Sequence, residues 1–274
     1  MFTLHNGDCL QVMPSIPSGS IDAIITDLPY GTTACKWDTI IPFEPMWKEV
    51  KRVLKPNGAF ITTASQPFTS TLIMSNPSAF NCEWIWNKSK AANFPQVKHK
   101  PLKIHENIIV FYGSNYNPQK EIRGKVRKKG GYFVSGDVAV SSGTPEKYNN
   151  EYYPKSILDY SIADNKGAGK HPTQKPVALY EYLIRTYTNE GETVLDIAMG
   201  SGTTIEAAER TGRNSIGIEK DKGIFETAVL RLKPFTPSNN RLHMDAGDSP
   251  RQPSQSTLEG FTPAEQGTTP APRQ

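Results

Sequence analysis

The feature that most constrains the fold is a regular alternation of short apolar runs and helical segments between residues 193 and 232. Thr193–Asp196 and Ser215–Glu219 have the apolar character of buried strands, and Thr203–Thr211 and Asp221–Leu232 have helical spacing. Strands that alternate with helices in this way pair in parallel and carry helices on both faces of the sheet. The sequence therefore predicts an α/β fold with a doubly wound, mostly parallel sheet.

The first part of the chain shows the same alternation. Ile21–Thr26 is an isoleucine-rich run that suits a strand buried on both faces. Strands are also expected over Ala59–Thr62, Cys82–Trp86 and Asn107–Tyr112, and helices over Glu44–Lys55, Gln66–Met74 and Pro176–Tyr187. From 88 to 170 Gly, Asn, Lys, Ser and Tyr dominate, and few long elements are expected. An irregular segment of that length indicates a functional insertion.

These patterns divide the chain into four parts. We expect one half of an enzyme domain over 1–87, an inserted recognition region over 88–170 and the second half over 171–233. The segment 234–274 is rich in Pro, Ser, Thr, Gln and Gly, and it lacks the apolar surface needed to offset the entropy of ordering. It is predicted to be a disordered tail.

Composition narrows the class of protein. The net charge is +4, which permits a polyanionic partner without requiring one. The cysteines Cys9, Cys35 and Cys82 lack the spacing of a zinc or disulfide site, so no metal is expected. Neither an apolar leader nor a membrane-spanning run is present, and we expect a soluble cytoplasmic protein of a bacterial host cell, either a monomer or a homodimer.

The first candidate site is Asp196–Thr204, where a predicted strand ends at a carboxylate and a Gly-Ser-Gly turn opens a helix. Glycine lets the backbone approach a ligand closely, and a helix N-terminus offers free N–H donors. Glu219 ends the next strand, where an acidic residue accepts hydrogen bonds from ribose hydroxyls in nucleotide-binding units. The turn lacks the GxGxxG spacing, which argues against NAD.

The second candidate site is the turn Asp27-Leu28-Pro29-Tyr30, at the carboxyl end of a predicted central strand. A carboxylate and the Leu28 carbonyl could accept both N–H groups of an exocyclic amino group and aim its lone pair at an incoming methyl group. Pro29 fixes the backbone, and Tyr30 offers a ring face on which a flipped base can stack. A plain turn after a strand could hold the same four residues, so the hypothesis depends on both sites together.

The order of these motifs resembles that of the DNA amino-methyltransferases of the β arrangement, particularly members carried by phages and prophages. Asp27–Tyr30 is similar to the family's (D/N/S)PPY motif, with Leu28 replacing the first proline, and Asp196–Thr204 is similar to DPFxGSGTT, with Ile-Ala replacing Pro-Phe. His171–Pro176 matches HPTQKP. Asn6–Cys9 is similar to the N-terminal acidic loop, and Pro101–Tyr112 and Tyr116–Gln119 to the segment around target recognition. The resemblance covers about residues 3–233.

The resemblance implies the Rossmann-like fold of S-adenosylmethionine-dependent methyltransferases and in-line methyl transfer to an amino group of a flipped base in double-stranded DNA, most often N6 of adenine. The implied catalytic residues are Asp27, Leu28, Pro29 and Tyr30. The implied cofactor-binding residues are Asp8, Cys9, Asp27, His171, Lys175, Asp196, Gly200, Ser201, Gly202, Thr203 and Glu219. Lys175 could equally form a surface ion pair, and Asp8 a helix N-cap.

Two basic runs are candidates for the DNA-facing surface, although a solvated surface would show the same pattern. The residues expected to contact DNA are Lys98, Lys100, Lys103, Arg123, Lys125, Arg127, Lys128 and Lys129.

Other functions stay open. Cytosine-N4 methylation uses the same fold, with a motif that more often begins with Ser. Protein-glutamine methylation uses an Asn-Pro-Pro-Tyr motif that follows its cofactor motif, whereas here the cofactor motif comes second. An inactive DNA-binding protein would not need the intact Asp27 and Tyr30. Cytosine-C5 methylation needs a cysteine nucleophile, usually after proline, and no cysteine here follows a proline.

Overall fold

The protein is built around a nine-stranded sheet of order β11-β1-β10-β9-β2-β3-β5-β4-β8. The computed structural model describes residues 1–32, 38–91, 93–135, 138–161, 174–235 and 244–245. The strands of this sheet are β1 (Phe2–Asn6), β2 (Ile21–Thr26), β3 (Leu54–Ala64), β4 (Phe80–Asn87), β5 (His105–Tyr112), β8 (Ile157–Asp159), β9 (Thr193–Asp196), β10 (Asn214–Glu219) and β11 (Met244–Asp245). Only β5 runs against its neighbours, so the predicted mostly parallel sheet is confirmed.

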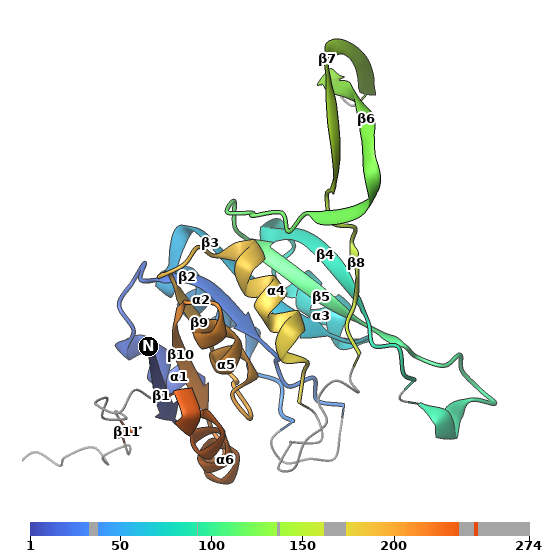
Figure 1. Ribbon diagram of the computed structural model, residues 1–274. Coiled ribbons are helices and arrows are strands. Elements are labelled where there is room, and N and C mark those ends of the chain that lie inside the picture. Colours follow the sequence, from blue (N-terminus) through green and yellow to red (C-terminus); the bar gives the residue numbers. More distant parts are fainter. Residues whose placement is uncertain (33–37, 92, 136–137, 162–173, 236–243, 246–274) are drawn as a thin grey trace, which may run out of the picture.

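Helices cover both faces of the sheet (Figure 1). On one face, α2 (Phe43–Val53) and α3 (Phe68–Ser75) pack against β2, β3 and β5, with Trp47 in contact with Phe60 and Phe111. The other face carries α4 (Val177–Tyr187) and α5 (Thr203–Arg210), and α6 (Lys222–Leu232) packs near β1 and β10. The short helices are α1 (Cys9–Val12), η1 (Met13–Ser15), η2 (Pro77–Ala79), η3 (Phe94–Gln96) and η5 (Lys233–Phe235).

The direction of chain progression reverses between β9 and β2, which lie side by side although they come from opposite ends of the chain. From β2 the chain continues outward to β3, and from β9 it continues the other way to β10. In open α/β sheets a ligand crevice forms outside the carboxyl ends of the strands at such a reversal. We call the edge at which β1, β10, β9, β2 and β3 end the carboxyl edge.

The predicted inserted region, 88–170, differs from the expectation. Two of its strands, β5 and β8, belong to the main sheet, and two long strands, β6 (Glu121–Ser135) and β7 (Val138–Tyr152), form a separate antiparallel hairpin. The expectation of few long elements was wrong because a ribbon that stands away from the body needs no buried face. Its strands therefore lack the apolar alternation that identifies a strand in a sequence.

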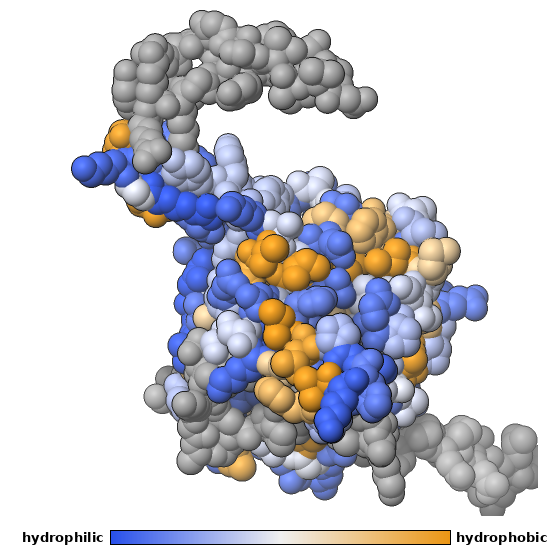
Figure 2. Space-filling view, turned by 90° about the vertical axis from the view of Figure 1, so that its right-hand side faces the viewer, coloured by the Kyte–Doolittle hydropathy of each residue, from blue (hydrophilic) through white to orange (hydrophobic). Residues whose placement is uncertain are grey.

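The hairpin leaves the body at the edge opposite the carboxyl edge. Because β5 is antiparallel to β3, Asn107 near its start pairs with Ala64 at the carboxyl edge. Its last residue, Tyr112, pairs with Ala59, farther from that edge. The chain then enters the hairpin, and β8 afterwards runs back in parallel with β4. The hairpin accordingly projects away from the carboxyl edge (Figure 1), and its base exposes hydrophilic side chains together with a few apolar ones (Figure 2), among them Ile122 and Val126.

The predicted tail, 234–274, lies mainly outside the described residues. Its described parts are the end of η5 and β11, which adds a two-residue strand beside β1. No helix within the described residues is long and apolar enough to span a membrane.

Candidate active site

Several polar residues of the two predicted sites meet at the carboxyl edge. Asp8 follows β1, Glu219 ends β10, Asp196 ends β9 and Asp27 follows β2. These strands are consecutive neighbours in the sheet, so the four carboxylates form a row along one edge. The two turns predicted to carry chemistry therefore lie at the ends of adjacent strands.

A hydrogen-bond hub at Asp196 joins the two turns. Thr26 Oγ1 donates to Asp196 Oδ1 over 2.7 Å, the backbone N–H of Ala198 donates to the same oxygen over 3.1 Å, and the Thr204 hydroxyl donates to Oδ2. Burial raises the pKa of Asp196 to about 7, although the hydrogen bonds from Thr204 and Thr26 partly oppose this. The side chain thus fixes the Gly-Ser-Gly turn onto β2, and any contact with a cofactor would be indirect.

The Gly200–Thr203 loop presents its backbone to a ligand. Gly202 has φ +81°, a left-handed conformation that favours glycine, and it is the N-cap of α5. Arg231 Nη1 donates to Ser201 Oγ over 3.1 Å and to Thr203 Oγ1 over 3.2 Å, so these hydroxyls already have protein partners. At Gly200 an added Cβ would meet nothing within 4 Å, which leaves open space above the loop. The loop therefore fits the close backbone approach expected of a cofactor cradle.

Glu219 and Asp8 complete the cradle. Glu219 accepts backbone hydrogen bonds from Gly200 over 2.9 Å and Asp221 over 2.8 Å, each on a different oxygen, and burial raises its pKa. One further acceptor position on each oxygen suits ribose hydroxyls. Asp8 is the N-cap of α1 and also pairs with Lys220, so the structural alternative foreseen for it is present.

Two predicted cofactor residues occupy other places. The Cys9 side chain is buried in the hydrophobic core, and burial raises the pKa of its thiol to about 12. Only its backbone could face a ligand. His171 lies outside the described residues.

The Asp27–Tyr30 turn, predicted to be catalytic, is anchored by Leu28, whose side chain is buried in the core. Asp27 Oδ1 accepts hydrogen bonds from the Thr63 hydroxyl and, over 3.0 Å, from the Tyr30 hydroxyl. Asp27 Oδ2 accepts one from Lys175 Nζ over 2.6 Å. The Tyr30 ring stacks on Phe68 with centroids 5.1 Å apart, which orients the ring and leaves its other face for a ligand.

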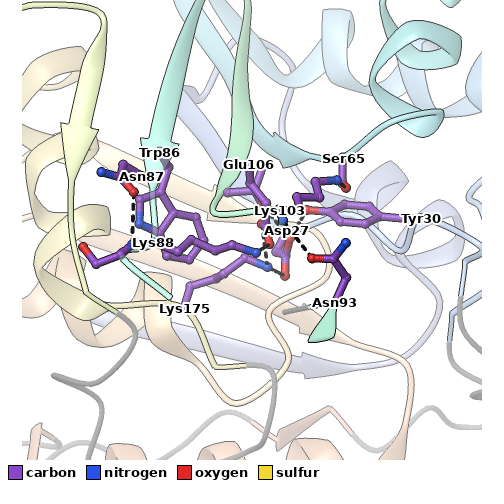
Figure 3. Close-up of polar contacts among 12 residues, drawn as sticks. Asp27, Tyr30, Ser65, Trp86, Asn87, Lys88, Asn93, Lys103, Glu106 and Lys175 are labelled. Atoms are coloured by element: carbon purple, nitrogen blue, oxygen red, sulfur yellow. Dashed lines mark hydrogen bonds and ion pairs between the residues drawn. The ribbon is translucent and has the colours of Figure 1, made fainter. Parts of the chain in front are cut away.

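Glu106 extends this network, and it was not among the residues predicted from the sequence. It lies near the start of β5, 2.9 Å from Lys88 Nζ and 3.7 Å from Lys175 Nζ (Figure 3). Burial by itself would raise the pKa of Glu106, but the neighbouring Lys175 and Lys88 outweigh burial and hold the pKa below its usual value. Its position at the carboxyl edge, where β5 begins, was the only sequence signal, and that signal depends on knowing that β5 is antiparallel.

The two predicted DNA-binding runs lie at opposite edges. Lys98 and Lys100 are exposed on the segment that joins β4 to β5 at the carboxyl edge, residues 88–104, which we call the β4–β5 segment. Lys103 of the same segment is partly buried and donates to the Ser65 hydroxyl. The second run belongs to β6 of the hairpin and is not brought to the catalytic turn: Arg123, Lys125, Arg127, Lys128 and Lys129. The side chains of its last three residues lie outside the described part.

A doubly wound sheet with a glycine-rich loop beside an Asp-Leu-Pro-Tyr turn is the arrangement that the resemblance implies for the class of amino-methyltransferases. The N6/N4 methyltransferase family, described as DNA methylase, matches residues 21–230, and the chain belongs to this family. It is an S-adenosylmethionine-dependent DNA methyltransferase, as the resemblance implied.

Curated relatives agree with this assignment. The chain is 26% identical over 277 residues to the Type II methyltransferase M.HinfI of Haemophilus influenzae, covering 88% of this chain and 71% of that one. It is 28% identical over 246 residues to the Type II methyltransferase M.HpaI of Haemophilus parainfluenzae, covering 82% of this chain and 72% of the relative.

Solved structures share the fold. The M1.HpyAVI–SAM complex superposes with a TM-score of 0.57 at 24% identity, covering 85% of this chain and 100% of that one. The PvuII DNA methyltransferase, described as cytosine-N4-specific, superposes with a TM-score of 0.61 at 18% identity, covering 88% and 90%. The fold is therefore shared with an enzyme described as cytosine-N4-specific.

Proposed function

We propose that this chain methylates the N6 amino group of adenine at a specific site in double-stranded DNA. The observation that carries the proposal is the placement of Asp27 beside the Gly200–Thr203 loop, at the ends of the adjacent strands β2 and β9. Asp at the first position of the catalytic motif favours adenine by the family resemblance. The relatives named as Type II methyltransferases support site-specific action on DNA.

The chemical task of the site is to orient a weak nucleophile. Asp27 and the Leu28 carbonyl accept the two N–H groups of the target amino nitrogen, which favours a pyramidal nitrogen with its lone pair directed outward. Among the described residues no other group donates to the Leu28 carbonyl, so it is available for this bond. Alignment of the reacting groups supplies most of the acceleration, and the flipped base avoids competing water.

Cofactor binding falls to the row of groups on β9, β10 and β1. The Gly200–Thr203 backbone holds the methionine part, Glu219 the ribose and Asp8 the adenine end. When bound, S-adenosylmethionine supplies an electrophilic methyl group on a sulfonium. Asp196 holds the Gly200–Thr203 loop against β2 and thereby sets its distance from Asp27.

DNA approaches the carboxyl edge and contacts the β4–β5 segment. This segment exposes Lys98 and Lys100 beside the apolar side chains of Phe94 and Val97. Figure 2 shows apolar and polar side chains interspersed on the face that carries it. Basic groups suit the phosphates, while exposed aromatic and aliphatic groups suit bases that have been unstacked. Target recognition within residues 88–170 is thus assigned to the part that borders the catalytic turn.

The test is to express the chain in a host that lacks adenine methylation and to sequence the host DNA with modification detection. The proposal predicts N6-methyladenine in one short sequence context and none after expression of the Asp27→Ala variant. N4-methylcytosine in a defined context would contradict the adenine assignment. Unmodified DNA, despite folded protein that binds S-adenosylmethionine, would contradict DNA methylation itself.

A further inference from the structure

Asp27 and Lys175 form an acceptor and a donor side by side at the catalytic turn. Their Oδ2 and Nζ atoms are 2.6 Å apart, and the two side chains keep 31% and 13% of their surface exposed. Figure 3 shows Lys175 reaching Asp27 from one side while Tyr30 lies on the other. The pair is therefore held in place by the protein and is still accessible to a ligand.

The remaining hydrogen-bonding capacity of the pair can be counted. Each carboxylate oxygen has two acceptor positions, and Asp27 Oδ1 fills both with Thr63 and Tyr30. Asp27 Oδ2 accepts only from Lys175 among the described residues, so one position remains. An ammonium has three N–H donors. Even if one serves Asp27 and another serves Glu106, a third is left for a ligand.

The charge of Lys175 is maintained by its surroundings. Burial alone would lower the pKa of Lys175, but Asp27 and Glu106 together raise it above its usual value. Glu106 is in turn fixed by Lys88, whose side chain is buried beside the Trp86 ring. Lys175 therefore remains a donor at neutral pH, with Glu106 3.7 Å from its Nζ atom.

We propose that Lys175 donates a hydrogen bond to N1 of the target adenine while Asp27 accepts one from the adjacent N6 amino group. This assignment rests on the proposed function. The Watson–Crick edge of adenine places an N–H donor next to a ring acceptor, which complements an acceptor next to a donor. Guanine and thymine present a carbonyl acceptor next to an N–H donor, so the same pair rejects them, whereas cytosine, with its N4 amino group next to N3, has the same order as adenine and is not rejected by this pair.

The proposed bond selects and orients the base, and it does not activate the nucleophile. A cation at N1 withdraws electron density from the amino nitrogen, which by itself would slow methyl transfer. The gain is geometric, because two bonds to neighbouring atoms of one edge fix the rotation of the base in its plane. Glu106 acts as a positioning residue, since its buried Oε2 has no hydrogen-bond partner among the described residues and attracts the Lys175 ammonium.

The experiment uses the full chain and duplexes that contain the site found by sequencing. The target adenine is replaced by 1-deazaadenine, in which C–H replaces N1, or by 7-deazaadenine as a matched control. Methyl transfer from S-adenosylmethionine is measured as kcat/KM for the wild type and for Lys175→Met. Lys51→Met serves as the control variant, because Lys51 is an exposed lysine on α2 that belongs to neither the catalytic nor the DNA-binding residues.

For the wild type we expect 1-deazaadenine to lower kcat/KM by roughly 10- to 100-fold, the range for a lost hydrogen bond to a charged group, and 7-deazaadenine to change it little. Lys175→Met should show a similar loss on adenine but almost no further loss on 1-deazaadenine. Replacing N1 by C–H also weakens base pairing and raises the electron density on the amino nitrogen. Both changes by themselves would speed methyl transfer. A lower kcat/KM on 1-deazaadenine would therefore indicate loss of the hydrogen bond to N1.

Two results would overturn the inference. One is a wild-type kcat/KM on 1-deazaadenine equal to that on adenine. This result does not depend on whether any variant folds. The other concerns Lys175→Met acting on 1-deazaadenine. If its fold loss in kcat/KM equals the product of the two single losses, Lys175 and N1 act independently. Absence of methyl transfer to unmodified adenine duplexes would instead contradict the proposed function, so the two failures can be told apart.

Discussion

The β4–β5 segment and the β6–β7 hairpin both carry runs of basic residues, yet they lie at opposite edges of the sheet. The β4–β5 segment joins strands at the carboxyl edge, beside Asp27, whereas the hairpin leaves from the ends of β5 and β8 that lie farthest from it. In the sequence the hairpin run is the denser one. We therefore assign DNA binding to the run that topology brings to the site, and not to the denser run.

Local pairing strengthens the contrast. At the base of the hairpin Lys120 pairs with Glu151 and Arg123 pairs with Glu121, so these two basic groups already have acidic partners. Among the described residues Lys98 and Lys100 form no ion pair, and their charge is available for phosphates. The predictions below compare the two edges, in order of decreasing effect.

The largest effect is expected at the catalytic turn. Asp27→Ala removes one acceptor of the target amino group, and loss of one such oriented group typically lowers kcat by about 100- to 1,000-fold. The measurement is the single-turnover rate of methyl transfer to the target duplex. Asp159→Ala is the matched control, because Asp159 is an exposed carboxylate at the same edge whose partner is Asn87. A comparable loss in the control would show that the effect is not specific to the turn.

The second prediction concerns the free energy of unfolding and how much of it is lost when the buried Asp196 is ionised. Asp196 has a folded pKa of about 7, above its unfolded value of about 4, so the folded state binds the proton more tightly. Stability is therefore greatest below the unfolded pKa and falls as pH rises towards 7, by about 1.4 kcal/mol per pH unit from this group.

Urea denaturation between pH 4.5 and 7 tests this slope. Asp196→Asn should remove this contribution. Asp22→Asn should keep it, because Asp22 lies at the opposite edge and pairs with Lys55. Identical pH profiles for wild type and Asp196→Asn would contradict the assigned protonation.

The third prediction concerns DNA affinity. The double substitution Lys98→Ala and Lys100→Ala removes two candidate phosphate contacts, so the slope of log K against log salt should fall in magnitude by about 1.8. At moderate salt we expect roughly a tenfold rise in KM for DNA with kcat nearly unchanged. Fluorescence anisotropy with labelled duplex at several salt concentrations measures the slope. An unchanged slope would remove the β4–β5 segment from the DNA interface.

The smallest effect is expected at the hairpin. The triple substitution Lys120→Ala, Arg123→Ala and Lys125→Ala removes more positive charge than the double substitution, yet KM for DNA should change by less than about twofold, because exposed ion pairs at a distant edge contribute little. The same anisotropy titration applies. If this variant loses more affinity than the double variant, DNA reaches the hairpin and the comparison is wrong.

The sequence was sufficient for the parallel strands β2, β3, β9 and β10, because each is largely buried and followed by a helix, whereas β1, β8 and β11 were not predicted. Strand β2 was predicted with its observed bounds, and the turns at Asp27 and Gly200 follow from residue types that break a strand. Their meeting could be expected because parallel strands end at one edge.

The antiparallel strand β5 limited what could be predicted at the site. Glu106 approaches Lys175 only because β5 inserts between β3 and β4 in the reverse direction, a pairing that local periodicity does not encode. For the same reason the edge from which the hairpin projects could not be foreseen. The side chains that hold Asp27, such as Thr63, are ordinary strand residues with no motif of their own.

The most direct test of the central claim is transfer of a labelled methyl group from S-adenosylmethionine to duplex DNA by the purified chain, followed by nucleoside analysis. Asp27 at the first position of its motif, beside the Gly200–Thr203 loop, predicts that the label is recovered as N6-methyldeoxyadenosine and that Asp27→Ala lowers the transfer by about 100- to 1,000-fold. Recovery of the label in cytosine, or undiminished transfer by the variant, would contradict the account.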